Sequence, residues 1–156
     1  MTPGFTIRRA QPEDDAAVAR ELAAYLAFIG EALDAHGLDH DIAQWQVAYD
    51  GRSGVLLVVA DPAGEVVGTA AVRTLEPGIG ELKRMWLRPA CQGGGVGRRL
   101  MDSCFDEARR LGCRALRLDT MAKLAAAVHL YRAYGFSEIP RYNDNRRADI
   151  WMERAL

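Results

Sequence analysis

The chain has 156 residues, of which 49% are hydrophobic and 26% charged, and its formal net charge at pH 7 is −1. A chain of this length most simply forms one domain, residues 1–156, that buries roughly 70% of its unfolded surface. Because acidic and basic residues balance, we expect no nucleic-acid partner, which usually requires a basic excess. No apolar run reaches about 18 residues and no signal-peptide core is visible, so we expect no membrane span and a cytoplasmic location.

The residues that most often bind metals do not form a metal-binding motif. Three cysteines, an odd number, stand at spacings that fit no zinc site: Cys91, Cys104 and Cys113. His36 and His40 are four residues apart, but Gly37 between them disfavours the helix that would bring their rings together. We therefore expect reduced thiols, as in a cytosolic protein, and no metal site.

The first fifty residues predict a strand and at least one helix. Residues 5–9 alternate like a short strand, and Pro12 then suits the first turn of a helix. Apolar residues recur at helical spacing after it: Val18, Leu22, Leu26, Ile29 and Leu33. The pattern fades from residue 34, where we expect a loop or a second short helix up to Tyr49.

Residues 54–87 predict three neighbouring strands. Residues 54–60 form a continuous apolar run, which is typical of a strand covered on both faces. The chain returns after a turn, so that residues 55–75 form a β-hairpin, and residues 80–87 alternate like a third strand.

After four closely spaced glycines the sequence predicts a helix, a strand, a second helix and a last strand. An apolar face marks the first helix: Val96, Leu100, Cys104, Ala108 and Leu111. Gly112 suits its C-terminal cap, residues 114–120 form the next strand, and Gly135 stops a helix over residues 122–134. Residues 149–155 then form the last strand. The order β-α-α-β-β-β-α-β-α-β is an α/β (α+β) mixture, antiparallel at first, with a βαβ crossover later.

The glycines from Gly93 to Gly97 stand where a strand becomes a helix. The first turn of a helix offers unpaired backbone N–H groups and a partial positive charge, and glycines let an anion approach them closely. Two common phosphate loops do not fit. Arg98 and Leu100 stand where a dinucleotide-binding fingerprint needs its third glycine, and no Gly-Lys-Ser/Thr sequence closes the loop. Two interpretations stay open: a cradle for a phosphate or diphosphate, and a tight turn that only connects strand and helix.

The glycine loop fits the pattern Gln-x-x-Gly-x-Gly at residues 92–97, and a Tyr-x-x-x-Gly-Phe sequence follows at residues 131–136. Together these motifs resemble the GCN5-related N-acetyltransferase (GNAT) superfamily, and most closely its small bacterial members. Residues 81–89 and 114–120 resemble the fourth and fifth strands of that family. The resemblance covers about residues 54–138.

The resemblance implies a mixed, mostly antiparallel central sheet that is splayed between its fourth and fifth strands, with helices on both faces. It implies acetyl-CoA as the co-substrate, its pyrophosphate held by the glycine loop: Gln92, Gly93, Gly94, Gly95, Val96, Gly97 and Arg98. The pantetheine arm is expected beside Met85, Trp86 and Leu87. The family often has an asparagine at the position of Leu124, so its contact with the cofactor arm is absent or replaced in this chain.

The resemblance also implies how an acetyl group would pass from the thioester to an amine. The backbone N–H of Met85 is the expected donor to the oxyanion. Tyr131, which is neutral at pH 7, is expected to bind the cofactor and to protonate the leaving thiolate. The alternative is that Tyr131 is a core aromatic residue, and Tyr134, one turn further on, serves as its internal control.

Glu81 is the expected general base. About 13 Å of strand separates it from Met85, so it would act through a water. The alternative is a surface charge paired with Lys83 or Arg73. Many members of the family need no dedicated base, because some of the amine is neutral at pH 7.

The acceptor is expected to be a primary amine of a small molecule or a peptide. Polyamines, amino-acid derivatives, aminoglycosides and protein amino groups all stay open. Acidic residues before the second strand would attract a cationic amine, or are solvated surface charges: Glu31, Asp34, Asp39 and Asp41. His36 or His40 would line the acceptor groove, and Tyr142 and Asn143 would close over it.

Two alternative functions are a non-catalytic acyl-CoA sensor and an acyltransferase that uses another acyl-CoA. Both keep the glycine loop, but a sensor needs no acid at Tyr131. A homodimer is a habit of the family and is expected for this reason alone.

Overall fold

The computed structural model describes residues 4–156. Its helices and strands are, in chain order, β1 (Thr6–Arg9), α1 (Asp15–Ile29), α2 (His40–Ala43), α3 (Trp45–Ala48), β2 (Gly54–Ala60), β3 (Val66–Glu76), β4 (Ile79–Leu87), α4 (Val96–Arg110), β5 (Ala115–Thr120), α5 (Ala125–Ala133), β6 (Ser137–Glu138) and β7 (Ile150–Ala155). Short 3-10 helices precede α1 and follow β4. The seven strands form one sheet in the order β1-β2-β3-β4-β5-β7-β6, parallel only between β4 and β5. The predicted mixed, mostly antiparallel sheet is confirmed, and β6 is an additional strand that the sequence patterns do not predict.

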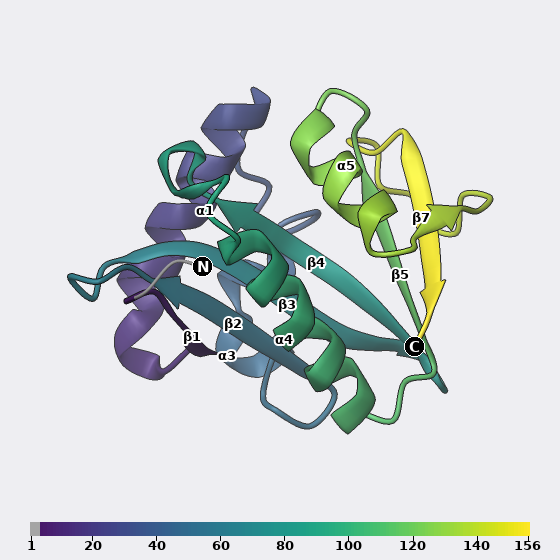
Figure 1. The fold of residues 1–156 in the computed structure, drawn as a ribbon, viewed down its shortest axis with the longest axis horizontal. Helices are drawn as coiled ribbons and strands as arrows, with labels where there is room; N and C mark the ends of the chain where they lie inside the picture. Colours follow the sequence, from purple (N-terminus) through teal and green to yellow (C-terminus); the bar gives the residue numbers. More distant parts are fainter. Residues whose placement is uncertain (1–3) are drawn as a thin grey trace.

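Helices cover both faces of the sheet (Figure 1). Val55, Leu57 and Val59 of β2 pack in one cluster with α4, whereas Leu56 and Val58 pack in another with α1 and α3. Successive side chains of a strand point to opposite faces. The continuous apolar run of β2 is therefore buried on both sides, as predicted.

The predicted amphipathic helix is α4. Val96, Leu100, Cys104 and Ala108 are fully buried against the sheet. Gly112 follows the last turn with a φ of +84°, a conformation that favours glycine and stops the helix. Burial of this one face supplies most of the stability of such a helix.

Two predicted helix boundaries are wrong. α1 ends at Ile29 because Gly30 adopts a φ of +74°, so Leu33 lies outside the helix and is 61% exposed. α5 begins at Ala125 rather than at residue 122, because a turn that starts at Met121 precedes it. Neither difference moves the helix that carries the Tyr-x-x-x-Gly-Phe motif.

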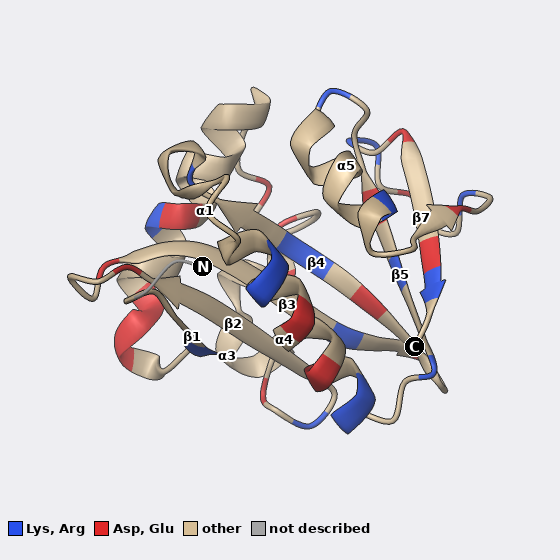
Figure 2. Cartoon of the chain, viewed as in Figure 1, with Lys and Arg blue, Asp and Glu red and all other residues tan. Residues whose placement is uncertain are grey.

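Charged residues cover the outer side of α4, with basic segments towards its two ends and acidic segments between them (Figure 2). They are all exposed: Arg99, Asp102, Asp106 and Arg110. Within residues 4–156, no helix is both long enough and apolar enough to cross a membrane.

β4 and β5 lie side by side only at one end. Residues 79–81 of β4 pair with residues 115–117 of β5, and beyond them the strands diverge (Figure 1). Arg84 has a φ of +56°, and the register between β3 and β4 shifts beside it, so a β-bulge bends β4 at this point. The hydroxyl of Thr69 on β3 donates a hydrogen bond of 2.8 Å to the Arg84 carbonyl. The expected splay between the fourth and fifth strands is confirmed.

We expect Leu100→Ala to lower the free energy of unfolding by about 2–5 kcal/mol, because its side chain is fully buried and its removal leaves a cavity. Asp106→Ala, in the same helix but exposed, is the matched control and should change that free energy by less than about 0.5 kcal/mol. Chemical denaturation followed by circular dichroism measures both. Equal effects of the two substitutions would contradict the packing of α4.

Candidate functional site

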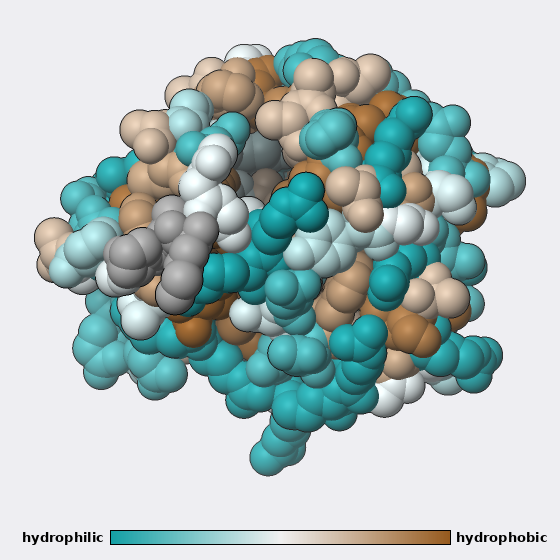
Figure 3. Space-filling model, in the orientation of Figure 1, coloured by the Kyte–Doolittle hydropathy of each residue, from teal (hydrophilic) through white to brown (hydrophobic). Residues whose placement is uncertain are grey.

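Two adjoining cavities open where β4 and β5 part, and Figure 3 shows a hollow in the surface between α1 and α5. The polar cavity, of about 480 Å³, has many charged and amide side chains in its lining, among them His40, Lys83, Arg84, Asp119, Asn143 and Arg147. The glycine cavity, of about 400 Å³, is lined by the end of β4, the glycine loop and the start of α5. The two cavities meet at shared lining residues: Tyr25, Met85, Leu124 and Ala127.

The glycine loop forms one wall of the glycine cavity. Gly93 and Gly95 have φ values of +85° and +88°, and a Cβ added at either would meet no atom within 4 Å. The backbone N–H groups from Gly93 to Arg98 have no hydrogen-bond acceptor among residues 4–156. Open space, unpaired donors and the positive end of α4 together fit a diphosphate. These features favour the cradle over a turn that only connects two elements.

The other residues of the loop contribute in different ways. The side chain of Gln92 donates a hydrogen bond of 2.9 Å to the Leu87 carbonyl and so ties the loop to the end of β4. Val96 is buried in the core, so only its backbone can face a ligand. A Cβ at Gly97 would make an ordinary contact of 3.6 Å with α5. Arg98 is exposed and lines the glycine cavity.

The end of β4 forms a second wall. Met85, Trp86 and Leu87 line the glycine cavity, and Met85 also lines the polar cavity. Beyond residue 81 the edge of β4 that faces β5 pairs with no strand in the described chain, so its backbone can pair with an extended ligand. The indole of Trp86 is held by a hydrogen bond of 3.1 Å to the buried Glu21 carboxylate.

Tyr131 and Tyr134 have different environments. Tyr131 is 5% exposed, lines the polar cavity, and its hydroxyl has no hydrogen-bond partner within residues 4–156. Burial raises the pKa of Tyr131, so the phenol stays protonated at neutral pH. The hydroxyl of Tyr134 instead lies 2.9 Å from both the Arg98 carbonyl and the Asp102 carboxylate. Tyr134 therefore joins α4 to α5 and lines neither cavity.

β4 and β5 enclose a wedge-shaped gap where they part. Glu81 lies at its closed end, in the last residue pair between the two strands. It is 2% exposed, forms an ion pair of 2.9 Å with Arg73, and accepts a hydrogen bond of 2.6 Å from the Tyr142 hydroxyl. The alternative interpretation of Glu81 as a surface charge is therefore wrong, because the side chain is buried, although its predicted ion pair with Arg73 is confirmed. Glu81 does not line either cavity, so the structure does not bring it together with Met85 and Tyr131.

Leu124 lies where both cavities meet, just before α5. Its side chain can make van der Waals contact with a ligand but offers no hydrogen bond. The hydrogen bond that an asparagine side chain could offer at this position is therefore absent from this chain.

The residues expected near the acceptor are only partly brought together. His40 and Asn143 line the polar cavity, whereas His36 does not, and Tyr142 is engaged with Glu81.

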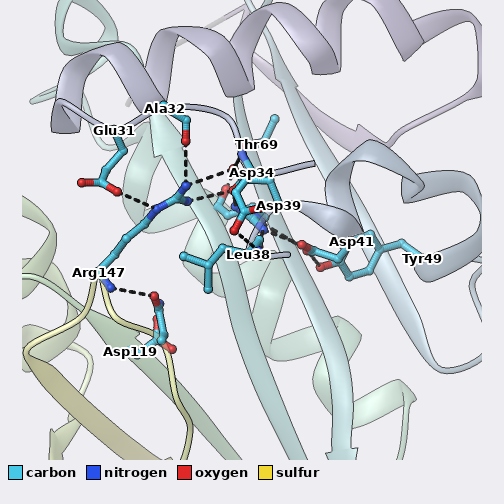
Figure 4. A network of polar contacts seen from close by, with 12 residues as sticks. Glu31, Ala32, Asp34, Leu38, Asp39, Asp41, Tyr49, Thr69, Asp119 and Arg147 are labelled. Atoms are coloured by element: carbon cyan, nitrogen blue, oxygen red, sulfur yellow. Dashed lines mark hydrogen bonds and ion pairs between the residues drawn. The ribbon is translucent and has the colours of Figure 1, made fainter. Parts of the chain in front are cut away.

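The acidic residues before β2 form a buried network with two arginines (Figure 4). Arg84 donates a hydrogen bond of 3.0 Å to Asp39 and also bonds to Asp41. Arg147 donates to the same Asp39 carboxylate at 2.9 Å and to Glu31 at 3.1 Å. Asp39 and Asp41 are therefore not solvated charges, and their negative charge is already matched by arginine rather than available to a cationic amine.

The charge of Arg84 controls the ionisation of Asp41. Burial alone would raise the pKa of Asp41, but the hydrogen bond and charge of Arg84 outweigh it and hold that pKa at about 2. Burial likewise raises the pKa of the neighbouring Tyr49, and the Asp41 charge adds to this effect. The network is thus ionic at neutral pH.

Sequence reasoning did not place several charged residues in the polar cavity, among them Lys83, Arg84, Asp119 and Arg147. A basic segment of β4 borders the gap between the strands in Figure 2. The alternation of β4 and β5 was the available signal, because polar residues alternate with core leucines on both strands. Within residues 4–156, no group of three or more His, Cys, Asp or Glu side chains is arranged to hold a metal ion.

Comparison with known proteins agrees with this geometry. Residues 19–136 match the model of the Acetyltransferase (GNAT) family. The chain is 37% identical over 139 residues to the IAA acetyltransferase of Azospirillum brasilense, covering 87% of this chain and 86% of that protein. It is 31% identical over 144 residues to the aminoglycoside N(6')-acetyltransferase type 1 of Stenotrophomonas maltophilia, with 87% and 88% covered.

Solved structures share the fold over almost the whole chain. A GNAT-family acetyltransferase from Staphylococcus aureus Mu50 has a TM-score of 0.88 at 16% identity, covering 97% of this chain and 98% of that one. YncA, a putative acetyltransferase from Salmonella typhimurium solved with its cofactor acetyl-CoA, has a TM-score of 0.72 at 25% identity, with 97% and 94% covered. The chain therefore belongs to the GNAT acetyltransferase family and is an N-acetyltransferase that uses acetyl-CoA.

Proposed function

We propose that this enzyme transfers the acetyl group directly from acetyl-CoA to a primary amine, without a covalent enzyme intermediate. One observation carries the proposal: the glycine cavity, lined by a loop of unpaired backbone donors, meets the polar cavity at Met85, and Tyr131 lines the polar side. The glycine cavity would take the coenzyme and the polar cavity the amine.

The main chain would do most of the work of holding the coenzyme. Backbone N–H groups of residues 93–98 bind the pyrophosphate, and the hydrogen bond from the Gln92 side chain to β4 keeps the loop in place. The free edge of β4 at residues 85–87 pairs with the pantetheine arm. Leu124 contacts the arm through its apolar side chain.

The chemical step forms a C–N bond and breaks a C–S bond. The amine nitrogen attacks the thioester carbonyl carbon, and the backbone N–H of Met85 donates to the oxygen as it becomes negative. One such donor lowers the barrier by about 3–4 kcal/mol. When the C–S bond breaks, the Tyr131 hydroxyl gives its proton to the sulfur and regains one that the nitrogen loses. The position of Tyr131 supports this role, because it lines the polar cavity and its hydroxyl has no other hydrogen-bond partner within residues 4–156.

Glu81 is proposed as a general base only through a relay of waters, because it lines neither cavity. The fraction of amine that is neutral at pH 7 also supports turnover without it. Its ion pair with Arg73 and its bond from Tyr142 suit a second task, which is to close the narrow end of the wedge.

The acceptor is proposed to be a small molecule. The names of two relatives, an IAA acetyltransferase and an aminoglycoside acetyltransferase, support this class. A polar cavity of about 480 Å³ is also of the size that small ligands occupy. A homodimer and a cytoplasmic location stay proposals that rest on the family resemblance.

The function as a whole is tested by following release of free thiol from acetyl-CoA in the presence of a panel of primary amines. Calorimetry measures the binding of acetyl-CoA in parallel. Binding without turnover of any amine would favour the non-catalytic sensor over the enzyme.

We expect Gly95→Ala to weaken acetyl-CoA binding at least about tenfold, because its Cβ would enter the space proposed for the pyrophosphate. Gly64→Ala is the matched control. Gly64 also has a positive φ, of +87°, and open space around it, but it lies in the turn between β2 and β3. Both variants should lose about 1–2 kcal/mol of stability from backbone strain. Calorimetric affinities that fall equally in both would contradict the cradle.

We expect Tyr131→Phe to lower kcat by about 10²–10⁴-fold and to leave the Kd for acetyl-CoA unchanged, because it removes only the proton donor. Tyr134→Phe is the internal control. It loses the hydroxyl that donates to the Arg98 carbonyl or the Asp102 carboxylate, which should cost about 1 kcal/mol of stability, while its kcat should stay close to that of the parent enzyme. Thiol release with the best amine of the panel measures kcat. An unchanged kcat in Tyr131→Phe would show that Tyr131 is only a core aromatic residue.

A further inference from the structure

The charged residues of the polar cavity divide into those that the protein pairs and those that it leaves unpaired. Arg73 is paired with Glu81 at 2.9 Å. Arg84 and Arg147 are paired with the acidic network of Figure 4, which contains Asp41. The lining residues with no ion pair within residues 4–156 are Lys83, Asp119 and the exposed Asp144 and His40.

Lys83 is the unpaired cation. Within residues 4–156 its ammonium has neither a hydrogen bond nor an ion pair, although the side chain is partly buried. Burial lowers the pKa of Lys83, and the charges of Asp41 and Glu81 do not fully offset burial and the neighbouring guanidinium groups. A partly buried ammonium without a partner is costly, and an anionic ligand would remove that cost.

Asp119 is the unpaired anion that is held most firmly. The side-chain amide of Asn143 donates to one oxygen at 2.6 Å, and that of Asn145 donates to the other at 3.1 Å. The amide of Asn143 is itself oriented by a hydrogen bond of 2.8 Å from Trp151. Neutral donors thus fix the direction of the carboxylate, and no cation of the described chain lies within ion-pair distance of it.

The strand register places Lys83 and Asp119 at the same level of the wedge. The last parallel pair joins Glu81 to Arg117, and each of the two residues lies two positions further along its strand. Core leucines alternate with them on both strands, so both side chains point to the face opposite α4. In an unsplayed sheet they would form a cross-strand ion pair. The parting of the strands instead leaves the polar cavity between two opposite charges.

We propose that the acceptor is a small zwitterion, an amine that also carries a carboxylate, with its carboxylate on Lys83 and its ammonium on Asp119. This inference rests on the proposed function, because it takes the polar cavity as the acceptor site. A free amino acid is the simplest molecule of this class. Its carboxylate and its ammonium give Lys83 and Asp119 the opposite charges that the protein does not itself supply.

The charges also differ between substrate and product. The bound ammonium loses two protons in all, one of which reaches the sulfur through Tyr131 while the other leaves to solvent. The nitrogen of the product is a neutral amide, so its attraction to Asp119 is lost, whereas the carboxylate stays on Lys83. Asp119 therefore binds the substrate in preference to the product.

The test compares each common α-amino acid and γ-aminobutyrate with its own carboxamide, by thiol release from acetyl-CoA. For the best acceptor we expect kcat/KM of the acid to exceed that of the carboxamide roughly tenfold to a hundredfold. Lys83→Met should raise KM for the acid by the same factor and leave KM for the carboxamide unchanged. Lys83→Glu should reverse the preference towards diamines, and Asp119→Asn should raise KM for both.

Arg132→Met is the matched control, since it removes one positive charge from the exposed side of α5 and should change neither KM. Calorimetry with acetyl-CoA shows that each variant keeps the coenzyme site. Equal kcat/KM for acid and carboxamide, or an equal loss for both in Lys83→Met, would overturn the zwitterion while the acetyltransferase proposal stands. If no amine turns over and no amino acid stabilises the coenzyme-bound enzyme against heat, both proposals fail.

Discussion

The ion pairs of Arg84 fix the bulge of β4 at the point where this strand has parted from β5. Arg84 sits in the bulge with a φ of +56°, and its guanidinium donates to Asp39, to Asp41 and to the Leu38 carbonyl, all on the α2 side of the molecule. A return of β4 to β5 would take Arg84 away from Asp41, which has no other ion-pair partner within residues 4–156, and breaking a buried pair costs about 3–5 kcal/mol. The separation of the strands is therefore a stable part of the fold rather than a gap that a ligand must open.

Asp39 connects the ion pairs of Arg84 to the opposite wall of the polar cavity. Its carboxylate is shared by Arg84 from β4 and Arg147 from the segment before β7, so one buried anion joins two walls of the cavity (Figure 4). The segment that carries Arg147 also carries the two asparagines that orient Asp119. A wall fixed at both ends can hold charged groups in set directions, which favours recognition of a substrate by charge.

Local sequence patterns predicted most elements and many of the residues that line the glycine cavity, but not the charged lining of the polar cavity. Helical spacing located α4, and the glycine loop and Tyr131 were identifiable because each belongs to a short motif. Charge pairing was not predictable, because Arg147 and Asp39 are 108 residues apart and nothing local distinguishes a paired aspartate from a solvated one. The burial of Glu81 was missed for the same reason, since Tyr142 covers it from 61 residues away. At Leu33, the helical pattern was overridden by the left-handed conformation of Gly30.

The lining of the glycine cavity was easier to predict than that of the polar cavity for a physical reason. The coenzyme is proposed to be held by backbone N–H groups and a strand edge, which many sequences can supply as long as the glycines allow the turn. The acceptor is proposed to bind side chains that are brought together only by the tertiary fold. Family membership therefore names the reaction and the coenzyme, while the acceptor must be inferred from unpaired groups in the polar cavity. In this enzyme those groups are a cation on β4 and an anion on β5, at matching positions on two strands that no longer touch. The bulge that is proposed to make room for the thioester thus also lies where these two charges part.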